Sequence, residues 1–217
     1  MSLYAELRFP AAPEPGAPVL VLLHGRGADE HDLLSLTPSL PAGLLVVAPR
    51  APFEAGPWGY GAGYAWYRYL GGTEPEPDSF ARSQRALEGF LDGIDTLLPV
   101  ARGPLLLGGF SQGGTMSLGF ALTHPGRASG VVNLSGFLPD HPTVRVTAET
   151  VAGTRFFWGH GSVDPNIPMA AAEAGWAALR GAGAELVAKS YRMGHTISPQ
   201  ELADASAWID AGRDGTR

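Results

Sequence analysis

The stretch that decides the fold is Gly109-Phe110-Ser111-Gln112-Gly113, a G-x-S-x-G pentapeptide. The apolar run at residues 104–110 predicts a buried strand before it, and residues 112–124 continue with helical spacing. Because glycine has no Cβ, glycines at both ends of the pentapeptide allow a strand to turn sharply into a helix. Such an elbow pushes its central side chain out of the sheet, as a nucleophilic serine requires. The pentapeptide therefore predicts a serine hydrolase with Ser111 as the nucleophile.

Outward from this elbow, runs rich in Val and Leu alternate with segments of helical period. This alternation predicts an α/β protein in which helices cover both faces of a mostly parallel sheet. The expected strands are residues 3–9, 18–23, 44–48, 104–110, 129–134, 154–158 and 184–190. The expected helices lie near residues 29–40, 79–98, 112–124, 167–181 and 199–211. The chain has 217 residues and no internal repeat, so we expect a single domain over residues 1–217.

Composition narrows the classes of function. The net charge is −6 without a basic cluster, which argues against a nucleic-acid partner. No apolar run reaches the roughly 18 residues of a membrane span, and the first residues lack a signal-peptide pattern. We therefore expect a cytoplasmic protein without stable membrane insertion. The chain has no cysteine, which excludes disulfides, thiolate metal ligands and a cysteine nucleophile. The oligomeric state stays open, a homodimer included.

One stretch, about residues 52–78, interrupts the alternation. It is rich in Gly and Pro, has no clear period, and carries seven aromatic residues: Phe53, Trp58, Tyr60, Tyr64, Trp66, Tyr67 and Tyr69. A loop of this length in a compact domain is usually functional or disordered, and so many aromatic residues argue against disorder. We interpret it as an ordered, cap-like segment beside the active site; the alternative is a packed surface loop.

The partners of the serine follow from the chemistry. A hydroxyl needs an imidazole to accept its proton, and the imidazole needs a carboxylate to hold its tautomer. In this fold the acid and the histidine follow the serine in that order, each on a loop after a strand. Asp164 follows the expected strand 154–158, and His195 lies between the last strand and the last helix. Asp164 could instead be a turn or capping residue before Pro165, and His195 a loop histidine, but their joint order favours a catalytic triad.

An acyl-transfer site also needs hydrogen-bond donors for the oxyanion. The backbone amide of Gln112, the residue after the nucleophile, is one candidate. The loop Leu23-His24-Gly25-Arg26-Gly27 follows an apolar strand, and we assign the backbone amide of Arg26 as the second donor. His24 is expected to shape this loop, with direct catalysis as the alternative. His160, four residues before Asp164, lacks a third ligand at metal-binding spacing, so no metal site is expected. No other cofactor is expected either.

With these residues in place, the chain resembles the phospholipase/carboxylesterase family of small α/β-hydrolases, which includes acyl-protein thioesterases. The matching pieces span nearly the whole chain; they are residues 23–30, 109–114, 134–136, 159–161 with 164–165, and 194–197. The resemblance implies the α/β-hydrolase fold, a triad of Ser111, Asp164 and His195, and an oxyanion hole of the Arg26 and Gln112 amides.

The resemblance also implies substrates and their contacts. Trp66 and Tyr67 look like the aromatic segment that lies near the substrate groove in this family. The thioesterase branch is expected to have an acidic residue after that pair, where this chain has Arg68. An apolar residue is common in the early glycine loop of the family, where this chain has Arg26, and both differences favour a bacterial esterase. The expected function is a serine carboxylesterase acting on small-molecule esters of short to medium acyl chains. The alternatives are a thioesterase or lysophospholipase acting on long acyl chains, and a non-catalytic binding protein that retains the fold.

Overall fold

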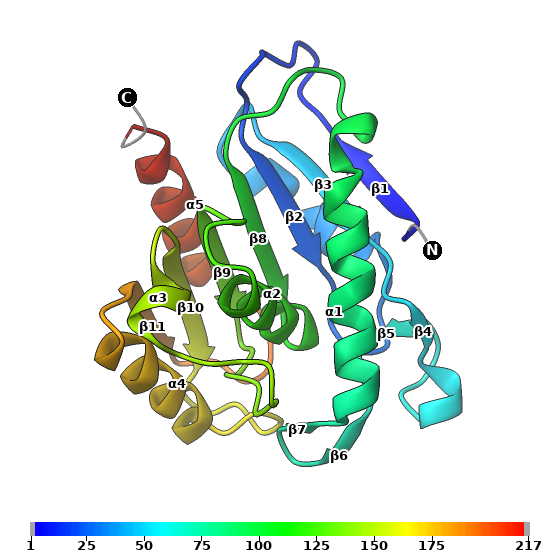
Figure 1. Ribbon diagram of the computed structural model, residues 1–217, viewed down its shortest axis with the longest axis vertical. Coiled ribbons are helices and arrows are strands. Elements are labelled where there is room, and N and C mark those ends of the chain that lie inside the picture. The colour runs from blue at the N-terminus through cyan, green and yellow to red at the C-terminus, as the bar shows by residue number, and fades with distance from the viewer. Residues whose placement is uncertain (1–2, 215–217) are drawn as a thin grey trace.

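The computed structural model describes residues 3–214, and a seven-stranded sheet runs through its centre (Figure 1). The strand order is β1-β3-β2-β8-β9-β10-β11. Only β1 runs antiparallel to its neighbour, and the other pairs are parallel. The strands are β1 (Ala5–Arg8), β2 (Val19–Leu23), β3 (Leu45–Pro49), β8 (Leu105–Phe110), β9 (Gly130–Leu134), β10 (Arg155–Gly161) and β11 (Glu185–Tyr191). All seven expected strands are therefore present in one sheet.

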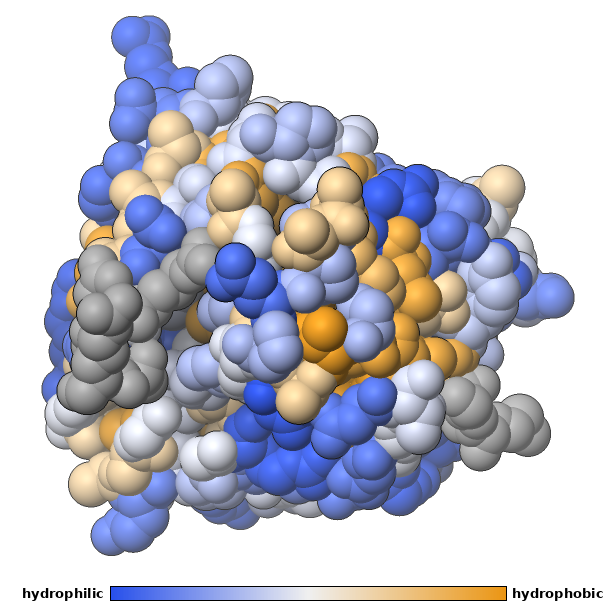
Figure 2. All heavy atoms as spheres, turned by 90° about the horizontal axis from the view of Figure 1, so that it is seen from above, coloured by the Kyte–Doolittle hydropathy of each residue, from blue (hydrophilic) through white to orange (hydrophobic). Residues whose placement is uncertain are grey.

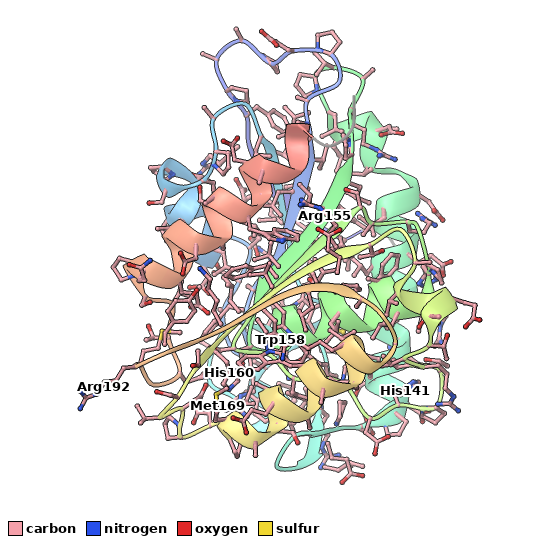
Figure 3. All side chains as sticks on the ribbon, turned by 90° about the vertical axis from the view of Figure 1, so that its left-hand side faces the viewer. His141, Arg155, Trp158, His160, Met169 and Arg192 are labelled. Carbon is pink, nitrogen blue, oxygen red and sulfur yellow. The ribbon has the colours of Figure 1, made fainter. Side chains whose placement is uncertain are left out.

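Helices cover the two faces of this sheet and bury two separate cores. The α-helices are α1 (Pro77–Asp92), α2 (Gln112–Thr123), α3 (Ala148–Val151), α4 (Met169–Gly181) and α5 (Pro199–Asp214). Helices α1, α2 and α4 contribute to the larger core, whereas α5 and the 3-10 helix η1 (Asp32–Ser39) contribute to the smaller one. Figure 3 shows α5 and α4 on opposite sides of the sheet. The predicted α/β class with both faces covered is confirmed.

The alternation of side chains along a strand explains the two cores. In β2, Val19, Val21 and Leu23 face the larger core, and Leu20 and Leu22 face the smaller one. Successive side chains of a strand point to opposite faces, so a strand that is covered on both sides must be apolar throughout. This is why the central strands are continuous Val and Leu runs in the sequence.

Several helices differ from the expected ranges. The expected helix at 29–40 is only the 3-10 helix η1, which contains Pro38. Proline has no amide hydrogen for an α-helical bond, so a regular α-helix is disfavoured there. The expected helix at 79–98 begins earlier, at Pro77, and ends at Asp92, because Gly93 caps it and a separate 3-10 helix η3 (Ile94–Leu97) follows. The short helix α3 was not expected.

The segment at 52–78 is ordered but has little regular structure. It contains the small hairpins β4–β5 and β6–β7 and the 3-10 helix η2. Their bounds are β4 (Phe53–Glu54), η2 (Gly56–Trp58), β5 (Tyr64–Ala65), β6 (Tyr69–Gly71) and β7 (Glu74–Pro75). A cap function for this segment stays a proposal. Within residues 3–214, no helix combines the length and apolar character needed to cross a membrane.

Candidate active site

Ser111 lies at the tip of a strained turn between β8 and α2. Its φ of 55° and ψ of −115° fall in a region that residues with a side chain rarely adopt. Holding such a conformation costs on the order of 1–3 kcal/mol, and strain of this kind is concentrated at functional sites. The turn needs glycine at its ends: a Cβ on Gly113 would lie 1.8 Å from the Leu23 carbonyl oxygen, and one on Gly109 would lie 2.4 Å from the Gly113 carbonyl carbon. The predicted elbow is therefore present.

Two loops bring Asp164 and His195 to the same edge of the sheet. Asp164 follows the end of β10, and His195 follows the end of β11. Strands β10 and β11 are parallel neighbours, so their carboxyl ends lie together. Backbone hydrogen bonds join the two loops: the Ser162 amide donates to the Tyr191 oxygen at 2.8 Å and the Val163 amide to the Met193 oxygen at 3.2 Å.

The three side chains form one continuous chain of hydrogen bonds. Asp164 Oδ2 lies 2.7 Å from His195 Nδ1, and His195 Nε2 lies 2.9 Å from Ser111 Oγ. A carboxylate can only accept, so the imidazole carries its proton on Nδ1, and Nε2 remains free to accept from the serine hydroxyl. This is the proton arrangement that activation of a serine nucleophile requires. The structure thus brings together the three residues that the sequence predicts as a triad.

Asp164 is held as a carboxylate despite its burial. Burial alone would raise the pKa of the Asp164 carboxyl, but hydrogen bonds from the Ile167 amide, the His195 ring and the Asn166 amide outweigh it. The pKa is therefore below its ordinary value. The two amides bind Oδ1 at 2.9 Å and 2.8 Å, which leaves Oδ2 for the imidazole. The side chain can then both orient His195 and stabilise its positive charge.

The two predicted oxyanion donors lie at neighbouring strand ends. Strands β2 and β8 are paired up to Leu23 and Gly109, so the loop that carries Arg26 begins beside the elbow. Gln112 is the first residue of α2, where backbone amides have no partner within the helix. Neither the Arg26 nor the Gln112 amide donates to another group within residues 3–214. Both amides are thus available to a ligand, and their role as an oxyanion hole is a proposal.

Trp66 and Tyr67 lie elsewhere than the family resemblance implied. Both are fully buried, and neither borders the hollow beside Ser111. Their backbone is held by the Gln112 side chain, whose oxygen accepts from the Trp66 amide at 3.0 Å and whose amide donates to the Tyr67 oxygen at 2.8 Å. The Trp66 indole donates to the His24 carbonyl at 3.0 Å. The geometry of this pair supports packing behind the elbow and the loop at residues 24–27 rather than contact with substrate.

His24 and His160 support the surrounding backbone. Nε2 of His24 accepts from the Ala51 amide at 3.0 Å, so its proton lies on Nδ1, which donates to the Gly25 oxygen at 2.8 Å. Burial lowers the pKa of His24 and favours its neutral form. His160 is fully buried at the end of β10 (Figure 3) and donates from Nε2 to the Ile167 oxygen at 2.9 Å. Neither ring lies in the Ser111 chain of hydrogen bonds.

A hollow of about 260 Å³ opens beside Ser111. It is bordered by Ser111, His195 and Arg26. It is also bordered by residues for which the sequence predicts no role, among them Asp32, Tyr69, Phe110, Asn166 and Ile167. Of these, Phe110 contacts the His195 ring, with centroids 4.8 Å apart. Tyr69 belongs to the aromatic segment but is two residues beyond the predicted pair. No spacing in the sequence distinguishes an aromatic residue at the hollow from one in the core.

A larger hollow of about 870 Å³ lies at the opposite end of the parallel strands. It is lined chiefly by Pro, Ala and Gly residues, and none of the three residues of the hydrogen-bonded chain borders it. Figure 2 looks onto this end of the molecule, where hydrophobic residues gather between hydrophilic ones. The volume of a hollow alone therefore does not identify the candidate active site. In the part of the chain that the structure describes, no group of three His, Cys, Asp or Glu side chains is arranged to hold a metal ion.

The strand order, the elbow and the hydrogen-bonded chain define the class of protein, a serine hydrolase with the α/β-hydrolase fold. Comparisons with known proteins give the family: residues 8–212 match the phospholipase/carboxylesterase family, and the chain belongs to it. Acyl-protein thioesterase 1 of Eremothecium gossypii is 28% identical over 239 residues, which cover 100% of this chain and 97% of that protein.

Solved structures agree on the fold. The carboxylesterase of Bacillus cereus has a TM-score of 0.78 and 23% identity, over 97% of this chain and 94% of its own. Acyl-protein thioesterase 2 of Zea mays also has a TM-score of 0.78, with 22% identity over 96% of this chain and 98% of its own. The predicted family and the predicted α/β-hydrolase fold are confirmed.

Proposed function

We propose that the protein is a carboxylesterase that hydrolyses carboxylic esters through an acyl-enzyme on Ser111. The observation that carries this proposal is the unbroken chain of hydrogen bonds from Asp164 through His195 to Ser111, at 2.7 Å and 2.9 Å. This chain ends at a hollow in which a substrate carbonyl can reach the hydroxyl. Both parts are needed, because a triad without access to substrate has no turnover.

The reaction follows from the positions of the protons. His195 Nε2 takes the hydroxyl proton as Ser111 Oγ attacks the ester carbonyl, and Asp164 stabilises the imidazolium that forms. The Arg26 and Gln112 amides bind the oxyanion of the tetrahedral intermediate. His195 then gives the proton to the departing alcohol, which leaves the acyl group on Ser111. In the second half, water loses a proton to His195 and attacks the acyl carbonyl. His195 then returns the proton to Ser111 Oγ, which leaves as the acid is released.

The dimensions of the hollow favour small acyl groups. Its volume of about 260 Å³ lies just below the range of about 300–1,000 Å³ that is typical of pockets for drug-sized ligands. We therefore propose short to medium acyl chains. The name of the Eremothecium gossypii relative supports a second candidate, hydrolysis of acyl thioesters, and a chain-length series separates the two.

The test is the hydrolysis of p-nitrophenyl esters that range from acetate to dodecanoate. We expect the highest kcat/KM with short or medium chains and a loss of about a million-fold in kcat in Ser111→Ala. The matched control is Ser35→Ala, an exposed serine outside the hollow, which keeps wild-type rates. Activity that rises through the longest chains favours the thioesterase or lysophospholipase function. Substantial activity in Ser111→Ala contradicts the triad, and a folded wild type without turnover supports a binding protein instead.

The proposed substrate is a small acyl compound, and the proposed site of action is the cytoplasm. The absence of cysteine supports this location, because the fold does not depend on an oxidising compartment. Localisation of a tagged chain in cells tests it. A homodimer stays a prediction, which light scattering at working concentrations tests.

A further inference from the structure

The Arg26 side chain places a fixed positive charge at the hollow beside Ser111. The guanidinium carbon lies 4.8 Å from the centre of the Tyr60 ring and 5.4 Å from that of Tyr69, and Arg26 borders the hollow. Two cation–π contacts of this kind restrict a long side chain that would otherwise be mobile. Cation–π contacts are not hydrogen bonds, so they do not occupy the N–H donors of the guanidinium.

No carboxylate pairs with this charge in the part of the chain that the structure describes. Among the side chains of residues 3–212, no carboxylate oxygen lies within 4.0 Å of the Arg26 guanidinium. Arg50, by contrast, binds Glu30 through two hydrogen bonds. The chain as a whole has a net charge of −6, whereas Arg26 places a cation without a carboxylate partner at the hollow.

Asp32 borders the same hollow and carries the opposite charge. Burial, and after it the neighbouring Asp29, raises the pKa of the Asp32 carboxyl. Additional negative charge is therefore disfavoured on the Asp32 side of the hollow. A negatively charged group on a substrate is favoured at Arg26 instead, where a planar guanidinium can bind a carboxylate through two parallel hydrogen bonds.

We propose that Arg26 binds a carboxylate of the substrate, so that the enzyme favours esters whose acid or alcohol portion carries a second, ionised carboxyl group. This specificity rests on the proposed esterase function and identifies its substrate class. The backbone amide of Arg26 acts on the oxyanion, whereas its side chain acts on a remote part of the substrate. The two roles are separable, because a substitution at residue 26 keeps the amide.

The test compares two matched pairs of chromogenic esters. For the acyl side, p-nitrophenyl hydrogen adipate is compared with p-nitrophenyl hexanoate; for the alcohol side, 3-acetoxy-4-nitrobenzoate is compared with 2-nitrophenyl acetate. The readout is the ratio of kcat/KM for the anionic ester to that for the neutral ester. We expect Arg26→Gln to lower this ratio by about ten- to hundredfold for at least one pair, as the loss of a charge-assisted hydrogen bond would. Arg26→Lys should restore part of it.

The control is Arg192→Gln, because Arg192 projects away from the molecule (Figure 3) and does not border the hollow. Its ratios should equal those of the wild type. Salt gives a readout on the wild type itself, which serves even where a variant fails to fold. The anionic-to-neutral ratio should fall as salt shortens the screening length from about 30 Å at about 0.01 M to about 3 Å at about 1 M.

Two outcomes would overturn the proposal and are distinguishable from each other. Ratios that are equal in wild type and Arg26→Gln for both pairs, or that do not respond to salt, remove the role of Arg26 and leave the esterase function intact. A wild type that hydrolyses none of the four esters removes the proposed function and the specificity with it.

Discussion

The buried carboxyl of Glu201 makes the stability of this protein depend on pH. Glu201 lies in the first turn of α5, with its backbone amide bound to Ser198 Oγ at 3.1 Å. Its side chain is fully buried, and neither carboxyl oxygen has a hydrogen-bond partner among the described residues. The neighbouring Gly159 leaves the necessary space, because a Cβ there would lie 2.1 Å from Glu201 Oε1. Burial raises the pKa of Glu201 to about 8.

The sign and size of the effect follow from this pKa. The unfolded chain loses the proton near the ordinary value of 4.5, whereas the folded protein keeps it up to about 8. Between these values the folded state binds more protons, so the free energy of unfolding falls as the pH rises. Each pH unit contributes about 1.4 kcal/mol, so the loss between about pH 4.5 and about pH 7.5 is on the order of 4 kcal/mol.

Glu201→Gln keeps the volume of the side chain and removes the titration. We expect the stability of the variant relative to the wild type to increase by about 4 kcal/mol over the same pH range. Urea unfolding followed by circular dichroism at the two pH values measures this difference. The control is Glu173→Gln on α4, an exposed position, whose difference from the wild type should not change with pH. A Glu201→Gln difference that is the same at both pH values would show that the native carboxyl is already ionised.

Three further substitutions test the site and its support. Asp164→Asn should lower kcat by about 10⁴-fold, as steady-state kinetics would measure. The oxygen of the new asparagine side chain still accepts from the two backbone N–H groups of the loop. Its NH₂ group then faces His195 Nδ1 and enforces the wrong tautomer. Gly113→Ala should destabilise the fold by more than about 4 kcal/mol, measured by thermal unfolding, because its Cβ would meet the Leu23 oxygen at 1.8 Å. Gln112→Met should lower the free energy of unfolding by about 1–3 kcal/mol for each buried backbone group that it leaves unpaired.

For each of these three substitutions, one result would contradict the expectation. An Asp164→Asn variant with wild-type kcat would show that the carboxylate does not set the tautomer. Wild-type stability in Gly113→Ala would contradict the close approach of the elbow to β2. Unchanged stability in Gln112→Met would mean that the backbone of residues 66 and 67 does not depend on this side chain.

The grouping of Ser111, Asp164 and His195 could be predicted from the sequence because their positions follow from a topological rule. Parallel strands place their carboxyl ends at one edge, so chemically suitable residues just after β8, β10 and β11 must lie near one another. The order Ser111, Asp164 and His195 then leaves few alternatives. The strands could be predicted equally well, because burial on both faces requires the continuous apolar runs by which they are recognised in the sequence.

The residues around these three side chains could not be predicted as well from the sequence, for a physical reason. Trp66, Tyr67 and Tyr69 are near neighbours of the same chemical kind, yet the first two are fully buried and only Tyr69 borders the hollow. Which aromatic ring enters the core depends on contacts with α1, α2 and the loop at residues 24–27, and no periodicity encodes these contacts. The surroundings of the Arg26 side chain could not be predicted for the same reason, because its neighbours Tyr60 and Tyr69 lie more than thirty residues away in the chain.

The rate of covalent labelling by a fluorophosphonate shows whether His195 and Asp164 activate Ser111 in the folded protein. Intact mass and peptide mapping should show one label per chain, on Ser111. His195→Ala should slow this labelling by about a thousandfold or more, by analogy with the loss of the general base in other triads. Labelling at another residue would show that Ser111 is not the nucleophile, and equal rates in wild type and His195→Ala would show that His195 does not activate it.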